Sequence, residues 1–402
     1  MSAVPALTTL GAPEVLRRVE RLTPFLQAQA ESAEKLGRLP DETAQAIRQT
    51  GVMRLLQPTR WGGLEADPAA FFKAVMSIAA ACGASGWVTG IVGIHAWELA
   101  LCDPKLQKEV WADDADVWIA SPYAPLGRAT PTEGGYRFSG RWQFSSGTDH
   151  CQWIFLGGLI ADEAGNFDPA RYYHFVLPRP DYTIVDDSWD VVGLRGTGSK
   201  DIIVDDAFVP AYRTIEALKV LDGRAAAESG CQSPLFRMPW SALFPNGITS
   251  AIIGIAEGAL AAHLSVQQER ASAPGNHARA DAFALAAVGE AASEIAASRA
   301  QLLGNVSTMY ELAVAGKEIP YALRAQGRRD QVRGSWRAVR ALDEIFARSG
   351  GGGLRTSGAL QRLWRDAHAG LNHFINVADG VYSAYSLTAM GMSPPDGVRL
   401  TI

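Results

Sequence analysis

A change in hydrophobic periodicity divides this chain into three zones and constrains its fold more than any other feature. Residues 12 to about 115 are rich in alanine and leucine and have helical periodicity. Residues 116 to about 215 carry short β-branched or aromatic runs, which Gly, Pro and Asp separate. Helical periodicity returns from about residue 235 to the end. This order predicts an α+β protein that is mainly α.

The three zones predict three domains. We expect an N-terminal α-helical domain at residues 1–115, a central antiparallel β-barrel at 116–225 and a C-terminal four-helix bundle at 226–402. The expected strands are the runs at 117–120, 136–139, 153–156, 172–177, 182–185 and 202–204. The expected helices are 68–81, which Asp67 and Pro68 open, then 83–101, 248–268, 279–315, 321–348 and 358–378.

The overall composition argues against several kinds of protein. A net charge of −5 gives no basic field that would attract nucleic acid. The four cysteines lie far apart and form no CxxC pair, so we expect reduced thiols and neither a disulfide nor a metal site. The N-terminus lacks a signal-peptide pattern, and no apolar run reaches the ~20 residues that span a bilayer. We therefore expect a cytoplasmic protein with no membrane anchor.

Two adjacent serines in the β-rich zone indicate a binding site. Ser145, Ser146 and Gly147 lie between aromatic residues, with Trp142 and Phe144 before them. Hydroxyl groups in an apolar setting need hydrogen-bonding partners. A planar heterocycle with ring nitrogens and carbonyl groups would supply them. The segment therefore favours a flavin site.

The glycine-rich segment at 193–198 allows two interpretations. Its glycines do not open a βα unit, so a Rossmann-type nucleotide site is not indicated. The segment could present backbone N–H groups and the Arg195 cation to a phosphate or a ring carbonyl. It could equally be a tight turn that needs glycine, and the residues alone leave both open.

Three histidines are candidate site residues. His368 and His373 are five residues apart, so on one helix they would point about 140° apart and could not face one metal. The reference pKa of histidine, about 6.5, suits a catalytic base at His373. A single helical histidine is nevertheless more often structural. His95 lies in an apolar helix, where a satisfied core residue is favoured over a cavity-lining one.

The motifs, taken in order, resemble the acyl-CoA dehydrogenase fold over nearly the whole chain. In detail they are similar to the oxygenase components of two-component flavin-dependent monooxygenases. The motifs lie at 39–43, 56–58, 61–63, 82–88, 142–153, 193–199, 328–331, 342–346, 349–351 and 361–373. The segments 121–125 and 304–307 favour the branch that hydroxylates phenols in bacterial steroid degradation. Acyl-CoA dehydrogenases commonly carry a glutamate base near the end of the Arg–Asp helix, where this chain has His373 and no glutamate.

The resemblance implies ortho-hydroxylation of a phenol, steroid-derived or otherwise bulky, to a catechol. An NAD(P)H-dependent flavin reductase would deliver reduced FMN or FAD as a diffusible cofactor. O2 would add at the flavin C4a carbon to give a hydroperoxide, and no metal would take part. Ser145 or Ser146 would hold the flavin N5 proton, and His373 would deprotonate the phenol.

The same resemblance assigns the other site residues. The flavin would contact Trp142, Phe144, Ser145, Ser146, Arg195, Thr197 and Arg270. In a homotetramer, Ser349 and Gly350 would meet the flavin of a neighbouring subunit. The substrate would contact Trp87, His95, Ser121, Tyr123 and His368, and Ser121 would bind either the flavin or the substrate hydroxyl group.

Other functions stay open on the sequence. The substrate could be a smaller phenol, such as hydroxyphenylacetate or a chlorophenol. An acyl-CoA dehydrogenase-like oxidoreductase is an alternative, against which the missing glutamate argues. A non-catalytic helical assembly protein is a third, but it would leave the serine pair without a purpose.

Overall fold

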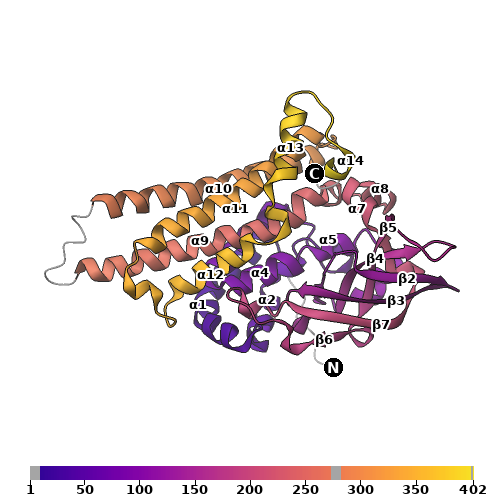
Figure 1. Ribbon diagram of the computed structural model, residues 1–402, viewed down its shortest axis with the longest axis horizontal. Helices are drawn as coiled ribbons and strands as arrows, with labels where there is room; N and C mark the ends of the chain where they lie inside the picture. Colours follow the sequence, from indigo (N-terminus) through magenta and orange to yellow (C-terminus); the bar gives the residue numbers. More distant parts are fainter. Residues whose placement is uncertain (1–9, 273–281, 400–401) are drawn as a thin grey trace.

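The computed structural model describes residues 10–272, 282–399 and 402, without the side chains of 270–272. Helices come first in the chain, then strands, then helices again (Figure 1). The helices before the strands are α1 (Ala12–Leu36), α2 (Asp41–Thr50), α3 (Pro68–Ala81), α4 (Gly83–Val92), α5 (His95–Leu99) and α6 (Pro104–Trp111). As predicted, α3 begins after Asp67, whose carboxylate accepts a hydrogen bond from the Ala69 N–H at 2.8 Å.

The single helix predicted for 83–101 is two helices. The chain leaves α4 at Gly93 and re-enters a helix at His95. At Gly93, a side chain would meet the Phe71 ring at 2.5 Å, so only glycine allows this close packing. Every residue of α4 and α5 is buried. The break matters because it sets the direction of His95, at the start of α5.

The strands form one open, mixed sheet. They are β1 (Ile119–Ala120), β2 (Gly127–Thr132), β3 (Gly135–Ser145), β4 (Trp153–Ala161), β5 (Phe167–Pro178), β6 (Thr183–Val185), β7 (Lys200–Pro210) and β8 (Thr214–Glu216). Their order is β6-β7-β3-β2-β4-β5-β8, and β1 pairs with β4. The prediction of a closed antiparallel barrel is therefore wrong. The end strands β6 and β8 do not pair, and β4 runs parallel to both β1 and β2.

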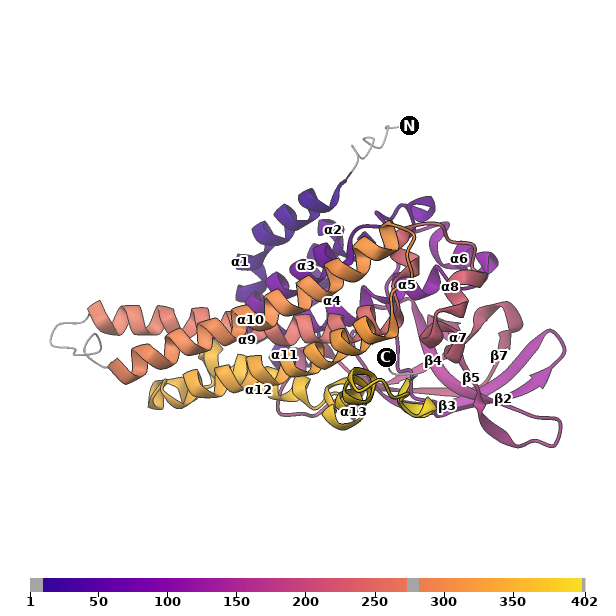
Figure 2. The same cartoon turned by 90° about the horizontal axis from the view of Figure 1, so that it is seen from above.

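Long helices follow the sheet and pack side by side (Figures 1 and 2). They are α9 (Trp240–Ser272), α10 (Ala282–Val314), α11 (Tyr321–Ala347) and α12 (Ala359–Leu371). Shorter helices are α7 (Ala217–Asp222), α8 (Arg224–Glu228), α13 (Ala378–Ala389) and α14 (Asp396–Arg399). The helix expected at 358–378 ends early, at Leu371. A short 3-10 turn, η11 (Phe374–Asn376), follows it, capped by the side chain of His373.

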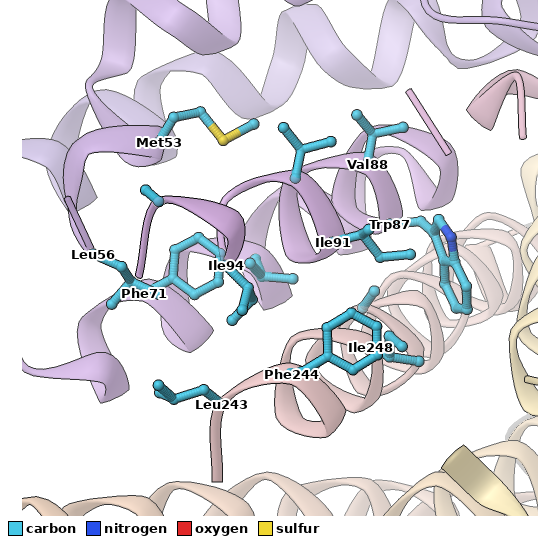
Figure 3. Packing of buried hydrophobic residues seen from close by; sticks show 14 of the residues in the cluster. Met53, Leu56, Phe71, Trp87, Val88, Ile91, Ile94, Leu243, Phe244 and Ile248 are labelled. Carbon is cyan, nitrogen blue, oxygen red and sulfur yellow. The ribbon is translucent and has the colours of Figure 1, made fainter. Parts of the chain in front are cut away.

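Helix α9 forms the core between the N-terminal helices and the later ones. It packs on α3, α4, α10, α11 and α12. Trp87 and Ile91 of α4 lie near Phe244 and Ile248 of α9 (Figure 3). By length and composition α9 could cross a membrane, but 72% of its apolar window is buried inside the protein. This burial explains its apolar sequence as that of a core helix.

Candidate active site

Ser145 and Ser146 differ sharply in their surroundings. β3 ends at Ser145, directly after Phe144, which has a left-handed backbone (φ 67°) and is 65% exposed. The Ser145 hydroxyl is fully buried and has no hydrogen-bond partner among the described residues. A buried hydroxyl without a partner costs about 1–3 kcal/mol, so a bound group that satisfies Ser145 would be favoured.

Ser146, in contrast, belongs to a continuous chain of hydrogen bonds. The Trp87 indole N–H donates to Ser146 Oγ at 3.1 Å, and Ser146 Oγ lies 2.7 Å from Ser199 Oγ. Ser199 Oγ is also 2.7 Å from Thr197 Oγ1, which donates to the Leu194 carbonyl at 2.7 Å. The predicted cofactor residue Thr197 is thus buried, and its hydroxyl group is already hydrogen-bonded within the turn.

The glycine-rich segment is a turn that α12 holds in place. Leu194 has a left-handed backbone (φ 53°), and its N–H donates to Asp366 Oδ1 at 2.6 Å. The Arg365 guanidinium donates to the Val192 carbonyl at 2.6 Å. Burial raises the pKa of Asp366 to about 6, although the Leu194 N–H opposes the shift. Arg195 donates to the Val191 carbonyl at 2.8 Å and remains partly exposed.

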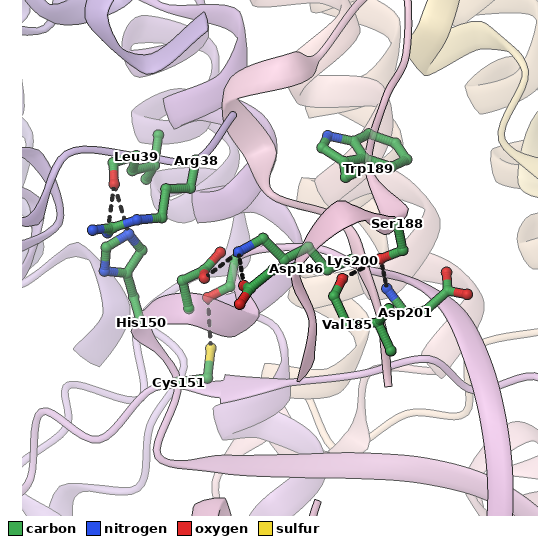
Figure 4. Close-up of polar contacts among 12 residues, drawn as sticks. Arg38, Leu39, His150, Cys151, Val185, Asp186, Ser188, Trp189, Lys200 and Asp201 are labelled. Carbon is green, nitrogen blue, oxygen red and sulfur yellow. Dashed lines mark hydrogen bonds and ion pairs between the residues drawn. The ribbon is translucent and has the colours of Figure 1, made fainter. Parts of the chain in front are cut away.

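Lys200 ties this turn to the serine segment. Its ammonium group binds Asp149 at 2.7 Å and Asp186 at 2.9 Å (Figure 4). The Gly147 N–H donates to the Thr197 carbonyl at 2.9 Å. The serine pair and the turn are therefore joined by a backbone hydrogen bond and by the Lys200–Asp149 ion pair. Two exposed apolar side chains flank them: Phe144 and, at 78% exposure, Val192.

A hollow lies on the α12 side of the same turn. It has a volume of about 380 Å³ and is bordered by parts of α1, α3, α9 and α12. Charged groups at its border are Glu34, Arg195, Glu257, Arg362 and Asp366. Arg195 thus faces a space that is large enough for a polar ligand group.

His373 lies at the centre of a set of aromatic rings. Its ring centroid is 6.0 Å from that of Trp87 and 6.3 Å from that of Phe244. Burial, together with the charge of Arg328, lowers the pKa of His373 to about 4. The prediction that His373 lies on one helix with Asp366 is wrong, because α12 ends before it. His373 instead caps the following turn, where its Nδ1 accepts the Ile375 N–H at 3.3 Å.

The aromatic rings around His373 continue through Tyr123 to His95, which contacts Ser121. Phe244 contacts Tyr123 with ring centroids 5.3 Å apart, and Tyr123 contacts His95 at 5.7 Å. His95 Nε2 lies 2.7 Å from Ser121 Oγ, and His95 Nδ1 faces the Ile119 carbonyl. His95 is fully buried and Ser121 is 7% exposed, so Ser121 is the more accessible of the two.

A buried ion pair supports Tyr123 from behind. The Glu98 carboxylate is bound by the Tyr123 hydroxyl and by His174 Nδ1. The Tyr172 hydroxyl donates to the Tyr123 carbonyl, so it must accept the hydrogen bond from His174 Nε2 at 2.9 Å. His174 Nε2 therefore donates to the Tyr172 hydroxyl. The contact between Glu98 and His174 Nδ1, together with the bond from the Tyr123 hydroxyl to Glu98, fixes the position of the Tyr123 ring.

Several predicted site residues are not brought into this arrangement. Trp142 is fully buried in the sheet, and its indole donates to the carbonyls of Ala124 and Gly157. It therefore cannot wall a flavin, because its neighbours on β3 and β4 already cover it. His368 binds Asp343 at 2.8 Å in an α11–α12 contact. Its contact with substrate stays a prediction.

The remaining predicted cofactor residues lie elsewhere. Ser349 and Gly350 follow α11 at the end of the long helices away from the sheet (Figure 1). Ser349 is buried and donates to the Phe346 carbonyl, whereas Gly350 is exposed. The side chain of Arg270 lies outside the described residues. In the part of the chain that the structure describes, no group of three or more His, Cys, Asp or Glu side chains could hold a metal ion.

Sequence reasoning missed Phe244, Ser199 and the Glu98–His174 pair. Ser199 follows the glycine-rich turn directly, and its small hydroxyl-bearing side chain could have indicated a hydrogen bond near the serine pair. Glu98 lies three residues after His95 in an apolar helix, where a carboxylate needs a partner. Its partner on β5 is far away in sequence, so no local pattern could have paired them.

The sequence and the fold match known proteins closely. Residues 246–377 match the family model described as the acyl-CoA dehydrogenase C-terminal domain. The chain is 48% identical to a pigment production hydroxylase of Rhodococcus erythropolis, over 97% of this chain and 99% of that one. It is 43% identical to the flavin-dependent monooxygenase oxygenase subunit HsaA of Mycobacterium tuberculosis, over 96% and 97%. The crystal structure of 3-HSA hydroxylase from Rhodococcus sp. RHA1 superposes with a TM-score of 0.92 at 42% identity, over 96% and 98%.

These similarities show that the protein has an acyl-CoA dehydrogenase-like fold. More narrowly, the chain belongs to the oxygenase components of two-component flavin-dependent monooxygenases. It is therefore an enzyme that works with reduced flavin.

Proposed function

We propose that this enzyme hydroxylates a bulky phenol, such as a steroid-derived one, at the ortho position to give a catechol. A separate NAD(P)H-dependent reductase would supply reduced FMN or FAD, and O2 would supply the new oxygen atom. One observation carries the proposal. The Trp87 indole binds Ser146 and also contacts the His373 ring, so one side chain joins the serine segment to the ring set.

The residues present fit a flavin. The Ser145 hydroxyl needs a partner, and the neighbouring residue Phe144 offers exposed apolar surface, as does Val192 before the glycine-rich turn. The turn at 193–198 offers Arg195 to a carbonyl or phosphate oxygen. When bound, reduced flavin supplies the electrons that activate O2. Ser145 would hold a ring N–H group, while the surrounding apolar side chains would exclude water.

The rings favour a phenol over an acyl thioester. The rings of Trp87, His373, Phe244 and Tyr123 contact one another in series, and such a set of rings suits a planar aromatic substrate. Glu98 is the nearest carboxylate to Tyr123, and both of its oxygens are already engaged. No described carboxylate is thus free there to remove a proton next to a thioester. We propose that His373 and Ser121 contact the substrate hydroxyl group.

Assembly and location are part of the proposal. The turn carrying Ser349 and Gly350 lies far from its own sheet, so in a homotetramer it would meet the flavin of a neighbouring subunit. Helices α9 to α12 would form the four-helix bundle through which the subunits associate. The composition supports a cytoplasmic location.

A substrate screen tests the proposal. The full chain is combined with a generic flavin reductase, NADH, and a panel of steroid-like, hydroxyphenylacetate-type and chlorinated phenols. We expect NADH use coupled to catechol formation, most efficiently with a bulky phenol. Hydrogen peroxide as the only product with every phenol, together with reduction of bound flavin by an acyl-CoA, would instead establish a dehydrogenase. His373→Ala should bind flavin normally and hydroxylate poorly.

A further inference from the structure

Three side chains of α11 hold the turn between α12 and α13. Arg328 donates to the Ile375 carbonyl at 3.3 Å. Gln331 Nε2 donates to Asn376 Oδ1 at 3.2 Å, and the Trp336 indole donates to the Asn376 carbonyl at 3.1 Å. Ile375 and Asn376 are both 1% exposed, so these bonds are shielded from water.

The orientation of the Gln331 amide follows from its partners. A guanidinium group can only donate, so the Gln331 atom that contacts Arg328 is the carbonyl oxygen. The amide nitrogen then faces Thr249 and Asn376, and it donates to both. Gln331 is 1% exposed and Thr249 is fully buried. The Asn376 atom that faces Gln331 must therefore be its side-chain oxygen.

The Asn376 amide is oriented independently from its other end. Its nitrogen lies 3.2 Å from the Gly370 carbonyl oxygen and 3.4 Å from the Leu371 carbonyl oxygen. Both carbonyls can only accept, so the atom that faces them must be nitrogen, which agrees with the contact to Gln331. These carbonyls belong to the last turn of α12, where backbone acceptors have no partner within the helix. Asn376 thus caps the end of α12 and joins it to α11.

The same contacts reach the His373 ring through Ile375. The Ile375 N–H donates to His373 Nδ1 at 3.3 Å, while Arg328 binds the carbonyl group of the same residue. The His373 ring centroid lies 6.0 Å from that of Trp87. The end of α12 packs on the same indole at Gly370, where an added methyl group would lie 2.9 Å from the ring. A shift at the end of α12 would therefore move the imidazole relative to the indole.

We propose that Asn376, oriented by Gln331, is a positioning residue that holds the His373 imidazole in place for hydroxylation. The inference rests on the proposed function, in which His373 contacts the substrate hydroxyl group. Asn376 is buried and acts through the turn that it caps. Without its amide, the last carbonyls of α12 lose their donor and the turn loses its side-chain bond to Gln331.

The test compares three variants of the full chain with wild type. Asn376→Ala removes the amide, and Trp336→Phe removes only the indole N–H group while an aromatic ring remains. Asn305→Ala is the matched control. The Asn305 amide also binds α11, at Asp330 with a distance of 3.0 Å, but it does not contact the turn.

Hydroxylation of a phenol is measured with saturating reduced flavin, together with the product formed per NADH and the affinity for flavin. Asn376→Ala should lose up to about 10²-fold in hydroxylation rate, because a small displacement of a reacting group has an effect of this size. Trp336→Phe should lose about 2- to 10-fold, as expected for one hydrogen bond. Asn305→Ala should hydroxylate like wild type. The affinity for flavin should stay the same in all variants, which separates a displaced His373 from a general loss of structure.

A second readout needs neither flavin nor substrate. NMR of the flavin-free protein with labelled histidine follows the titration of His373, whose pKa is lowered to about 4 by burial and by the charge of Arg328. Release of the turn in Asn376→Ala should hydrate the ring and raise this pKa toward its ordinary value of about 6.5. Asn305→Ala should keep the wild-type value.

Either of two results in Asn376→Ala would overturn the inference: a normal hydroxylation rate, or a His373 pKa unchanged from wild type. An equal loss of hydroxylation in Asn305→Ala would overturn it as well. If Asn376→Ala does not fold, the same two measurements on Trp336→Phe decide. If wild type hydroxylates no phenol, the proposed function fails, and the pKa comparison still shows whether Asn376 holds the turn.

Discussion

Replacing Glu98 by glutamine should destabilise the protein by about 3 kcal/mol, the low end of the ~3–5 kcal/mol range for breaking a buried ion pair. Glu98 is 1% exposed and His174 is 3% exposed, so neither charge is hydrated. Glutamine preserves the shape and one acceptor, but it removes the anion that both His174 Nδ1 and the Tyr123 hydroxyl contact. The loss also frees the Tyr123 ring, which Glu98 holds through its hydroxyl group.

The effect should depend on pH in a defined direction. Burial alone would raise the pKa of Glu98, but His174 and Tyr123 bind the carboxylate and hold that pKa below its usual value of 4.5. A lowered pKa in the folded state stabilises the protein above the unfolded-state pKa. That contribution is lost as the pH falls through the folded-state value. The part of the gap between wild type and Glu98→Gln that comes from the Glu98 carboxylate should therefore shrink as the pH falls below about 5.

Urea unfolding followed by tryptophan fluorescence, at one fixed protein concentration, measures this gap. Glu109→Gln is the matched control, because Glu109 also binds a tyrosine and a cation, Tyr212 and Arg213, but near the surface. The control should cost no more than about 1 kcal/mol. Equal costs for the two variants, or a Glu98→Gln gap that persists unchanged in acid, would refute the reasoning.

Three other variants probe the site and its support. Asp366→Asn should keep the bond from the Leu194 N–H. Because the pKa of Asp366 is raised in the folded state, the wild type should gain stability as the pH falls from about 6 to about 4, and the variant should lack this gain. Measuring the unfolding midpoint of both proteins over this pH range checks the prediction. Ser145→Ala should leave the flavin-free protein as stable as wild type, because its hydroxyl has no partner, yet weaken flavin binding in a fluorescence titration; unchanged flavin affinity would exclude Ser145 as the contact. Gly90→Ala should cost several kcal/mol in thermal unfolding, since its new methyl group would meet a backbone carbonyl of α9 at 2.6 Å, whereas Gly289→Ala faces open space and should be neutral or stabilising.

Much of the architecture could be predicted from periodicity. The long helices and the β-rich centre were predicted because their patterns are local, and the cap at Asp67 placed the start of α3 correctly. Strand β2 was not predicted, since Gly127–Thr132 contains a glycine and a proline and few strand-forming residues. Its place between β3 and β4 comes from pairing with segments elsewhere in the chain. Sheet closure is likewise a property of pairing, which explains why the barrel prediction failed.

In the site, too, local features could be predicted from the sequence and contacts between distant segments could not. Ser145 and Ser146 were predicted from an apolar context, but only the structure shows that Ser146 is satisfied and Ser145 is not. The direction of Trp142 could not be read from sequence, because a tryptophan beside a turn can face either side of a strand. The tautomers of His95 and His373 depend on backbone groups that folding brings to each ring.

The most direct test of the central claim is to follow the oxygen atom. Wild-type enzyme with its reductase, NADH and a bulky phenol is supplied with oxygen-18 gas in ordinary water, and the product is examined by mass spectrometry. We predict a catechol that carries one heavy oxygen atom. A catechol without the label, or NADH consumption that yields only labelled hydrogen peroxide with every phenol, would contradict the account.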